Sequence, residues 1–369
     1  MGPALGYRSF VGKIGFCLWV LGLAAGCTTG AAAQEQAATQ DESITTLHVY
    51  TNLVQIPTLV LGPDREQLKA PIAEKRFSVS VDSGRWFRAT HVRREGDDPI
   101  SLAILLDMRG GEGDFAPNLA DVIADLPPSL LNAKDHVSIY ALGCDLMQSL
   151  NDAPADAAQM KLGIDKALTF WDTQKKDLTC VQQDHLWDAL AYVAGRLYQL
   201  PGRRVILALT QGKDSGSKHT WNEARRYLQD TGVAVFGISH DFPLAREKNR
   251  SFFSTRIIGT YEDPFSYVCE LSGGLVFRVE IQALAATTKT VATMLRDRYI
   301  VEFPRPSNAT SGPHEMRVKI DRGDTDFIVA TGITVPLPDP AVLADPTTVS
   351  VGPKDTPELG DRHIMSKPQ

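Results

Sequence analysis

Polar side chains that could do chemistry follow several apolar runs of the chain. Asp107 comes directly after the run Ile100–Leu106, and its carboxylate could bind a divalent cation, pair with a basic side chain, or cap a loop or helix. His185, His240 and Asp241 lie near the ends of other predicted elements and could form the acid and base of a hydrolytic site. The histidines show no spacing typical of metal ligands, so we expect no histidine-based metal centre.

The cysteines fit a chain that is exported to an oxidising compartment. Cys17 lies in the N-terminal apolar run and Cys27 follows it, which leaves Cys144, Cys180 and Cys269. An odd number allows at most one bond within the chain, and we predict a Cys144–Cys180 disulfide at one edge of the predicted sheet. The alternative is a set of unpaired thiols, with Cys269 as a core residue.

Motifs of the common enzyme classes are missing from the sequence. There is no Gly-x-Ser-x-Gly elbow, no His-Glu-x-x-His pair, no phosphate-binding Gly-x-x-x-x-Gly-Lys loop and no Cys-x-x-Cys pair. The loop Gly212–Ser217 is rich in glycine and serine, but its spacing favours a turn that leads into a helix. We therefore predict that the protein is not an enzyme.

Strands and helices alternate in the middle of the chain and must position these side chains. The apolar runs predict buried strands, and the runs between them with a period near 3.6 residues predict amphipathic helices. The expected strands cover 100–106, 136–142, 204–209 and 233–238, and the main expected helices cover 155–171, 184–200, 218–230 and 281–297. This order predicts an α/β fold with a doubly wound, mostly parallel sheet flanked by helices, whose ligands bind at the carboxyl ends of the strands.

Short alternating segments flank this α/β region on both sides. Residues 44–96 and 298–335 alternate in hydrophobicity with a period of two, and we expect them to pack together as one small β-sandwich. The domain boundaries then place the α/β domain at 97–297. Residues 336–369 are rich in proline and aspartate without periodicity, which predicts a disordered tail.

The N-terminus has the order of a secretory signal peptide: basic residues, a short apolar run and then small residues. We expect residues 1–26 to be removed and residues 27–43 to form a flexible tether. The segment before Cys27 is similar to a bacterial lipobox, which predicts lipidation of that cysteine; ordinary cleavage before Gln34 is the alternative. The predicted location is periplasmic, or the outer membrane or cell surface as a lipoprotein, and otherwise secreted.

Composition limits the partners of the chain. Its 369 residues carry 38 Lys and Arg against 44 Asp and Glu, which gives a net charge of −6. An acidic chain without a dense basic block is a poor nucleic-acid binder, and no apolar run has the roughly 18 residues that span a bilayer. Contact with a membrane is therefore expected only through the N-terminal lipid anchor.

The order of the predicted elements resembles a von Willebrand factor type A (VWFA) domain, and in particular the VWFA-related family of secreted bacterial proteins first noted in acidobacteria. The most specific segments are LWDAL at 186–190, GRRVILALTQG at 202–212 and LSGGLVFRV at 271–279, with the closing element RDRYIVEF at 296–303. The resemblance covers about residues 45–331 and implies a β segment on each side of the A domain.

The resemblance also implies a Mg²⁺ or Mn²⁺ adhesion site, but this chain departs from its ligand pattern. Of the Asp-x-Ser-x-Ser motif only Asp107 is present, and Arg109 and Gly111 stand at the two hydroxyl positions. Asp184 stands at the threonine position, and Gln211 replaces the last aspartate. Because hard cations prefer oxygen ligands and a guanidinium keeps its charge, we expect no metal here; a metal, if present, would bind Asp107 and Asp184.

These observations predict a non-enzymatic module that binds another protein through the face carrying Asp107, Arg109, Gly111, Asp184 and Gln211. Two alternatives remain: a metal-dependent adhesion protein with a rearranged ligand set, and a secreted hydrolase that uses His185 and His240. The chemistry of the protein partner is not indicated by the sequence.

Overall fold

The computed structural model describes the folded part of the chain. It covers residues 48–50, 53–63, 66–68, 70–96, 98–109, 122–123, 126, 131–174, 176, 183–240, 263–305, 312–321, 327–330, 334–335 and 348–350. The chain divides into Met1–Thr46 and Leu47–Gln369, and the first unit lies outside the described residues. The predicted signal peptide, tether and lipidated Cys27 therefore stay predictions.

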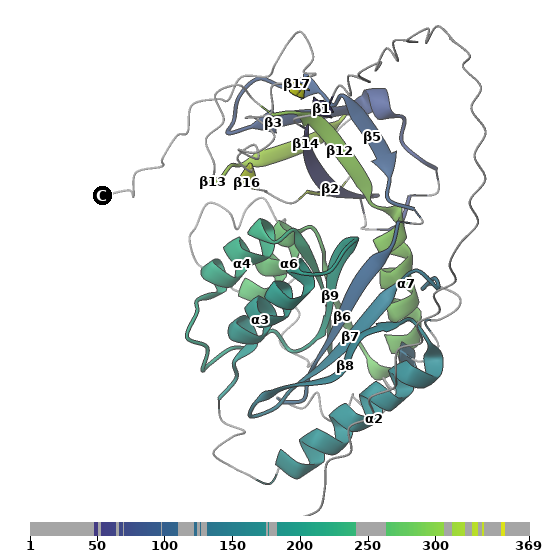
Figure 1. Cartoon of the computed structure of the whole chain (residues 1–369), viewed down its shortest axis with the longest axis vertical. Coiled ribbons are helices and arrows are strands. Elements are labelled where there is room, and N and C mark those ends of the chain that lie inside the picture. Colours follow the sequence, from purple (N-terminus) through teal and green to yellow (C-terminus); the bar gives the residue numbers. More distant parts are fainter. Residues whose placement is uncertain are drawn as a thin grey trace, which may run out of the picture. The chain divides into compact units, whose positions relative to one another are not determined.

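A six-stranded sheet forms the centre of the α/β part (Figure 1). Its strands are β6 Ile100–Asp107, β7 His136–Leu142, β8 Leu146–Pro154, β9 Arg203–Leu209, β10 Val233–His240 and β11 Val276–Val279. They lie side by side in the order β11-β10-β9-β6-β7-β8, and only β8 runs antiparallel to its neighbour. The predicted doubly wound, mostly parallel sheet is confirmed.

Helices cover both faces of this sheet (Figure 1). They are α2 Ala157–Gln174, α3 Leu186–Tyr198, α4 Trp221–Asp230, α6 Pro264–Ser272 and α7 Leu284–Asp297, and α7 is preceded by the short helix η4 Ile281–Ala283. Apolar side chains of α2 and α7 pack in one core with one face of the strands, and those of α3, α4 and α6 pack in a second core on the other face. All eight residues of β6 are buried, as expected for a strand between two helical layers.

Local signals explain where the helices begin and end. Thr220 and Glu223 form a reciprocal capping box at the start of α4. Asp263 caps α6, Pro264 occupies its first turn, and Gly273 ends it in the left-handed conformation with φ 96°. The proline and the glycine are both helix-boundary signals that are visible in the sequence.

The flanking β segments interleave in two antiparallel sheets. The strands are β2 Leu53–Leu61, β3 Phe77–Val81, β4 Phe87–Arg88, β5 His91–Arg94, β12 Tyr299–Pro304, β14 Met316–Ile320 and β15 Phe327–Ala330, with the short helix η1 Glu74–Arg76 before β3. One sheet has the order β15-β2-β12-β5 and the other β14-β3-β4. Both contribute to a single apolar core, so the predicted β-sandwich of N-terminal and C-terminal segments is confirmed.

Two features of these segments go beyond what the alternating pattern predicts. The alternating run 86–92 divides between β4, which pairs with β3, and β5, which pairs with β12. In the tail, β17 Thr348–Ser350 pairs in parallel with β1 His48–Tyr50, and β16 Thr334–Val335 pairs with β13 Gly312–Pro313. Residues 348–350 of the predicted disordered tail therefore form a strand, because backbone pairing does not require alternating hydrophobic side chains. The other residues of the tail lie outside the described part.

A buried charged cluster joins β5 and β12 to the start of the six-stranded sheet. The carboxylate of Glu95 accepts hydrogen bonds from Arg203 Nη1 at 2.7 Å and from Arg298 Nε at 2.8 Å. Nearby, Asp135 accepts from the backbone N–H of Ile100 at 2.9 Å and pairs with Arg296. These groups lie at the amino ends of β6 and β9, opposite the strand ends where ligands are expected.

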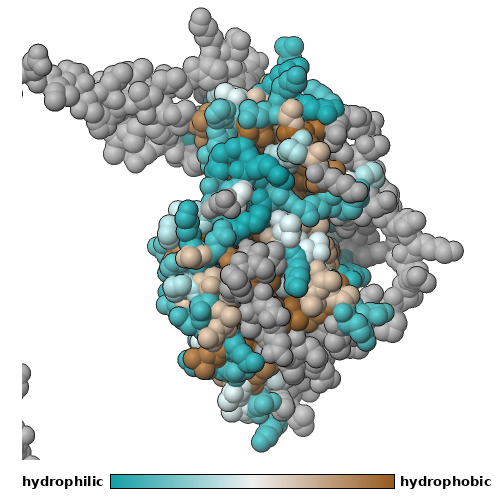
Figure 2. Space-filling view, turned by 90° about the vertical axis from the view of Figure 1, so that its right-hand side faces the viewer, coloured by the Kyte–Doolittle hydropathy of each residue, from teal (hydrophilic) through white to brown (hydrophobic). Residues whose placement is uncertain are grey.

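The surface mixes polar and apolar residues. Figure 2 shows one side of the molecule, on which hydrophilic residues and smaller apolar groups are interspersed. Among the described residues, none of the helices is both long enough and apolar enough to cross a bilayer.

Candidate functional site

The strand order of the sheet defines where a ligand site is expected. Numbered along the chain, the six strands have the order 3-2-1-4-5-6, so the direction of winding reverses between β6 and β9. Ligands of open α/β sheets bind outside the carboxyl ends of the strands at such a switch point. Asp107 is the last residue of β6, and Thr210 directly follows β9, so both lie at this point.

Asp107 is buried and firmly held. Its Oδ2 accepts a hydrogen bond from the hydroxyl of Thr210 at 2.6 Å, and its Oδ1 accepts from the backbone N–H of Arg109 at 3.2 Å. Thr210 also accepts from the backbone N–H of Gly212 at 3.0 Å. Thr210 was not among the predicted site residues. Its hydroxyl directly follows β9, which lies next to the strand that ends at Asp107, and this position in the sequence could have indicated the contact.

The side chain of Arg109 joins two carboxylates. Its Nη2 lies 2.5 Å from Oδ1 of Asp184, and its Nε lies 3.9 Å from Oδ1 of Asp107. The Arg109 side chain is only 2% exposed, and its Nε and Nη1 make no hydrogen bond. A guanidinium with a fixed positive charge therefore stands beside both carboxylates that a metal at this face would need.

Backbone hydrogen bonds from the loop after β9 fix the position of Asp184. Its N–H donates to the hydroxyl of Ser215 at 2.9 Å. Its carbonyl accepts from the N–H groups of Ser215 and Gly216 at 3.0 and 2.7 Å. The backbone of Asp184 is thus held independently of its side chain, which is 17% exposed.

The environment of Asp184 disfavours its ionised form. Burial, together with the nearby charges of Asp107 and Asp214, raises the pKa of this carboxyl to about 7, although the Arg109 guanidinium acts to lower it. Asp184 therefore changes its charge near neutral pH.

Side chains of the loop Gly212–Ser217 cap the N-terminus of helix α3. The carboxylate of Asp214 accepts from the backbone N–H of Trp187 at 3.3 Å and from the hydroxyl of Ser217 at 2.5 Å. Ser217 in turn accepts from the N–H of Asp188 at 3.1 Å. These bonds satisfy amide groups of the first turn of α3.

The other predicted site residues have different positions. Gln211 follows Thr210 at the same strand end and is partly buried. Gly111 and Asp241 lie outside the described residues, and the side chain of His240 is not described. His185 lies at the N-terminus of α3, where its ring packs against Gly216. The predicted hydrolytic group is therefore not assembled from described residues.

Cysteine pairing is described in part. Cys144 is disulfide-bonded, and its backbone N–H donates to Oε1 of Gln174 at 2.9 Å. Cys269 is a free, buried thiol, in agreement with its predicted place in the core. Cys180 lies outside the described residues, so the Cys144–Cys180 pairing stays a prediction.

The residues of this face do not suit a divalent cation. Within the described part of the chain, no three His, Cys, Asp or Glu side chains converge as a metal centre would require. Asp107 and Asp184 already have a cation between them in Arg109, and a divalent ion there would be repelled by it.

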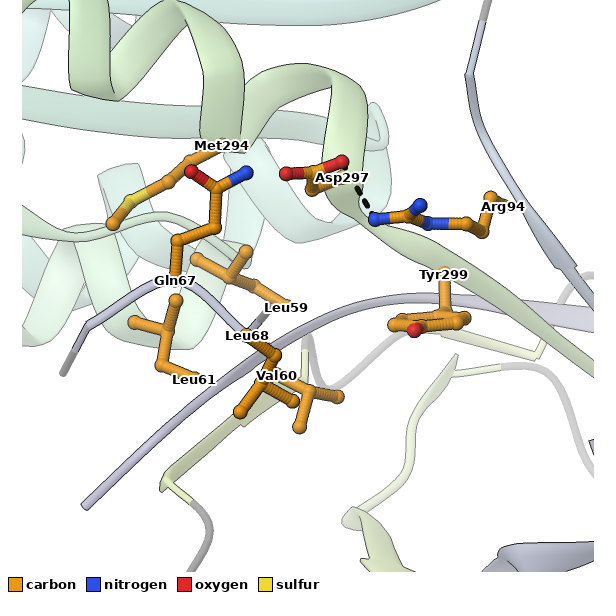
Figure 3. A pocket seen from close by; sticks show the side chains of 9 residues that line it. All are labelled: Leu59, Val60, Leu61, Gln67, Leu68, Arg94, Met294, Asp297 and Tyr299. Atoms are coloured by element: carbon orange, nitrogen blue, oxygen red, sulfur yellow. Dashed lines mark hydrogen bonds and ion pairs between the residues drawn. The ribbon is translucent and has the colours of Figure 1, made fainter. Parts of the chain in front are cut away.

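A pocket between β2 and α7 is too small to be an alternative site (Figure 3). Its walls combine apolar side chains such as Leu61 and Met294 with the Arg94–Asp297 ion pair at 2.6 Å. The space that water can enter measures about 10 Å³, which is room for roughly one water molecule.

The strand order, the helices on both faces and the aspartate after the first strand of the sheet are those of a VWFA-like fold. The α/β part has a von Willebrand factor type A-like fold. The resemblance predicted from the sequence is confirmed at the level of the fold.

No family model and no curated protein matches the chain. Among solved structures, proximal thread matrix protein 1 from the mussel byssus is 12% identical, with a TM-score of 0.42 over 58% of this chain and 51% of that one. The chain thus aligns with about half of that protein.

Two bacterial structures align with most of their own length. An aerotolerance-related membrane protein from Bacteroides fragilis is 14% identical, with a TM-score of 0.36 over 53% of this chain and 98% of that one. The vWF domain of the type V pili tip protein Mfa5 from Porphyromonas gingivalis is 10% identical, with a TM-score of 0.35 over 54% and 95%.

Proposed function

We propose that the protein is an exported, non-enzymatic module that binds another protein through the strand-end face of its VWFA-like domain, without a divalent cation. The observation that carries this proposal is the position of Arg109. Its buried guanidinium, 2.5 Å from Asp184 and 3.9 Å from Asp107, supplies the positive charge that a metal would otherwise supply.

Export rests on the N-terminal sequence. Basic residues, a short apolar run and small residues stand in the order of a signal peptide, and Cys27 stands where a lipoprotein is acylated. A lipid at Cys27 and the polar tether after it would hold the domain at the periplasmic or outer surface of a membrane. Mass spectrometry of the mature N-terminus distinguishes acylated Cys27 from a free chain that begins at Gln34.

Binding rather than catalysis is supported by the chemistry of the face. Asp107 has its oxygens engaged by Thr210 and Arg109, and Asp184 is paired with Arg109. The Thr210 hydroxyl does donate to the Asp107 carboxylate, but both side chains are buried, so this pair is not open to a substrate as a hydrolytic nucleophile and base would be. The partly exposed residues of this face, Asp184 and Gln211, lie instead at a topological switch point, where ligands of such sheets bind.

A thermal melt in EDTA and then in millimolar Mg²⁺ or Mn²⁺ tests the proposal. A ligand at 100 times its Kd stabilises a fold by about 2.7 kcal/mol, which is several degrees for a domain of this size. We expect the same melting temperature in both conditions. A saturable shift that Asp107→Ala removes would instead establish a metal-dependent adhesion site.

A further inference from the structure

The sheet β14-β3-β4 has an outer face that points away from the α/β part. Phe77 and Val81 of β3 belong to the core of the β-sandwich, so Ser78 and Ser80 between them point outward. The other sheet of the sandwich lies on the α/β side, because Leu59 of β2 belongs to a core that β2 shares with the six-stranded sheet. The outer face of β14-β3-β4 is therefore a separate surface of the molecule.

Basic side chains border the serines on this outer face. The strand register places Lys319 of β14 and Arg88 of β4 on either side of Ser78, in one row across the three strands. Arg317 of β14 lies opposite the next outward serine, and Arg85 stands in the loop before β4. All four basic residues are exposed, and the two outer strands are about 10 Å apart. We call Arg85, Arg88, Arg317 and Lys319 the basic face.

An exposed tryptophan lies within the basic face. Trp86 is 43% exposed, and the ammonium of Lys319 lies over its ring, 4.7 Å from the centroid. Lys319 and Trp86 come from the two strands that flank β3, so their contact bridges the middle strand. The serines beneath them, Ser78 and Ser80, are only 6% and 2% exposed. The basic face thus combines cations with one accessible aromatic ring.

Three of the four side chains of the basic face have no acidic partner. In the described part of the chain, Arg85 and Arg88 make neither a hydrogen bond nor an ion pair. The ammonium of Lys319 lies over an aromatic ring rather than beside a carboxylate. Arg317 differs, because its Nε lies 3.3 Å from Oε1 of Glu315. The donors of the first three are therefore available to an anionic partner.

The nearby carboxylates leave an excess of positive charge on this surface. Asp82 is buried and contacts the ring of His314 at 2.7 Å. Glu315 and Asp321 are exposed at the two ends of β14, and Arg76 stands beside Asp321, to whose carbonyl it donates. With Arg76, five basic side chains stand against these three carboxylates. The central row across the sheet contains no carboxylate.

The length of chain before the β-sandwich indicates what the basic face meets. Residues 28–47 separate Cys27 from β1. A flexible chain of this length spans about 25 Å, so a lipid on Cys27 would keep the β-sandwich close to the bilayer surface. Basic side chains near an anionic membrane surface are attracted to it, and tryptophan is favoured at the membrane–water interface.

We propose that the basic face binds the anionic phospholipid surface of the membrane that holds the anchor. The proposal rests on the proposed function for that anchor, whereas the basic face is built by described residues alone. Headgroup phosphates pair with Arg85, Arg88 and Lys319, and the ring of Trp86 lies at the level of the headgroups. Because these residues come from separate segments of the chain, they form no basic block in the sequence.

This contact would orient the strand-end face. The β-sandwich joins the α/β part at the amino ends of β6 and β9, through the hydrogen bonds of Glu95 with Arg203 and Arg298. Asp184 and Gln211 lie at the opposite, carboxyl ends of the strands. A sandwich held on the bilayer by its outer face would therefore turn the strand-end face away from the membrane, where a protein partner can reach it.

Vesicle sedimentation tests the basic face without the lipid anchor. The mature chain 27–369 is made with Cys27→Ser, so that it keeps every described residue but carries no acyl group. We expect it to partition onto vesicles of equal parts phosphatidylglycerol and phosphatidylcholine, far less onto pure phosphatidylcholine, and less at high salt. Arg88→Gln and Lys319→Gln should each lower the partition constant about fivefold, because each removes one cation from the anionic surface.

A matched pair of substitutions separates the basic face from the net charge of the chain. Arg226→Gln in α4 and Lys289→Gln in α7 remove one exposed arginine and one exposed lysine from helices of the α/β part. We expect this control pair to leave binding unchanged, whereas Arg88→Gln with Lys319→Gln should lower it about twenty-fivefold. Both pairs should keep the melting temperature of the wild type, since all four side chains are exposed.

The outcomes that overturn the proposal are distinct from those that overturn the anchor. No partition onto the anionic vesicles, or an equal loss in the two pairs, would overturn the basic face as a membrane contact. Heparin binding that depends on Arg88 and Lys319, in the absence of vesicle binding, would overturn the membrane in favour of an anionic polysaccharide. Mass spectrometry of the mature N-terminus tests the anchor separately: a chain that begins at Gln34 would overturn it, and the vesicle assay would still decide the basic face.

Discussion

The guanidinium of Arg109 lies 2.5 Å from the carboxylate of Asp184, at the carboxyl end of the strand that carries Asp107. Three charged groups from two segments of the chain, 107–109 and 184, thus lie together in a largely buried cluster. Burying charges is costly unless they are paired, so this arrangement persists only while its members compensate one another. The cluster makes the face rigid and sensitive to the loss of any one charge.

Removal of the Arg109 charge should destabilise the protein strongly. Arg109→Gln leaves Asp107 and Asp184 without their buried cation, and such a loss costs about 3–5 kcal/mol. Urea denaturation at pH 8 measures it. The matched control is Arg93→Gln, which breaks the exposed Arg93–Asp98 pair and should cost less than about 1 kcal/mol. Equal effects of the two substitutions would show that the Arg109 pair is not important for stability.

Asp184 should make stability depend on pH in an unusual direction. Its pKa is raised to about 7 in the folded protein, above the ordinary value of 3.8 for an aspartate, so the folded state binds its proton more tightly than the unfolded state. The stability that this proton contributes is complete below about pH 4 and is lost as the pH rises through 7. We therefore expect the wild type to lose stability relative to Asp184→Asn between pH 5 and pH 8.

Urea midpoints of both proteins at pH 5, 6, 7 and 8 check this expectation. The difference between them is the informative quantity, because other groups titrate alike in both. Parallel curves would mean that Asp184 keeps an ordinary pKa. A wild type that gains stability relative to Asp184→Asn as the pH rises would mean that Arg109 dominates its environment.

The fold could be predicted because its signals are local. A strand buried on both faces must be continuously apolar, as Ile100–Leu106 is, and Pro264 and Gly273 mark the ends of α6. The two-part nature of the run 86–92 could not be predicted, because β4 and β5 are assigned to different sheets by long-range partners. The pairing of β17 with β1 also could not be predicted, because it is made by backbone groups and does not require a periodic pattern of side chains.

The site could be predicted less fully than the fold. Asp107 follows from its place after a buried strand, but its contact with Thr210 depends on two strands 103 residues apart lying next to each other. Resemblance to a family placed Arg109 and Asp184 on one face, yet only the structure gives their distance.

The disulfide of Cys144 should stabilise the loop after β7. Disulfides typically contribute about 2–4 kcal/mol, so reduction with dithiothreitol should lower the melting temperature by several degrees. Peptide mapping without reduction identifies the partner, which we predict to be Cys180. In that case Cys144→Ser and Cys180→Ser should destabilise the protein equally. Cys269→Ser is the control that leaves the disulfide intact.

Glu95 should be a second point of sensitivity, far from the strand-end face. Its side chain is 1% exposed and pairs with both Arg203 and Arg298. Burial lowers the pKa of Arg203, and the negative charge of Glu95 opposes that lowering. Glu95→Ala leaves two buried guanidinium groups without this carboxylate and should cost at least about 3 kcal/mol in urea denaturation. A cost below 1 kcal/mol would show that backbone carbonyls alone satisfy these arginines.

Restoring the hydroxyl positions of the family pattern should restore a metal response. In the double variant Arg109→Ser and Gly111→Ser, the cation that repels a divalent ion is gone and two oxygen ligands join Asp107. We expect millimolar Mg²⁺ or Mn²⁺ to raise the melting temperature of this variant, by several degrees near saturation, and to leave the wild type unchanged. Adding Asp107→Ala to the double variant should abolish the shift. A variant that folds but ignores both ions would mean that Asp184 and Gln211 block the site on their own, and that Arg109 is not the residue that excludes the metal.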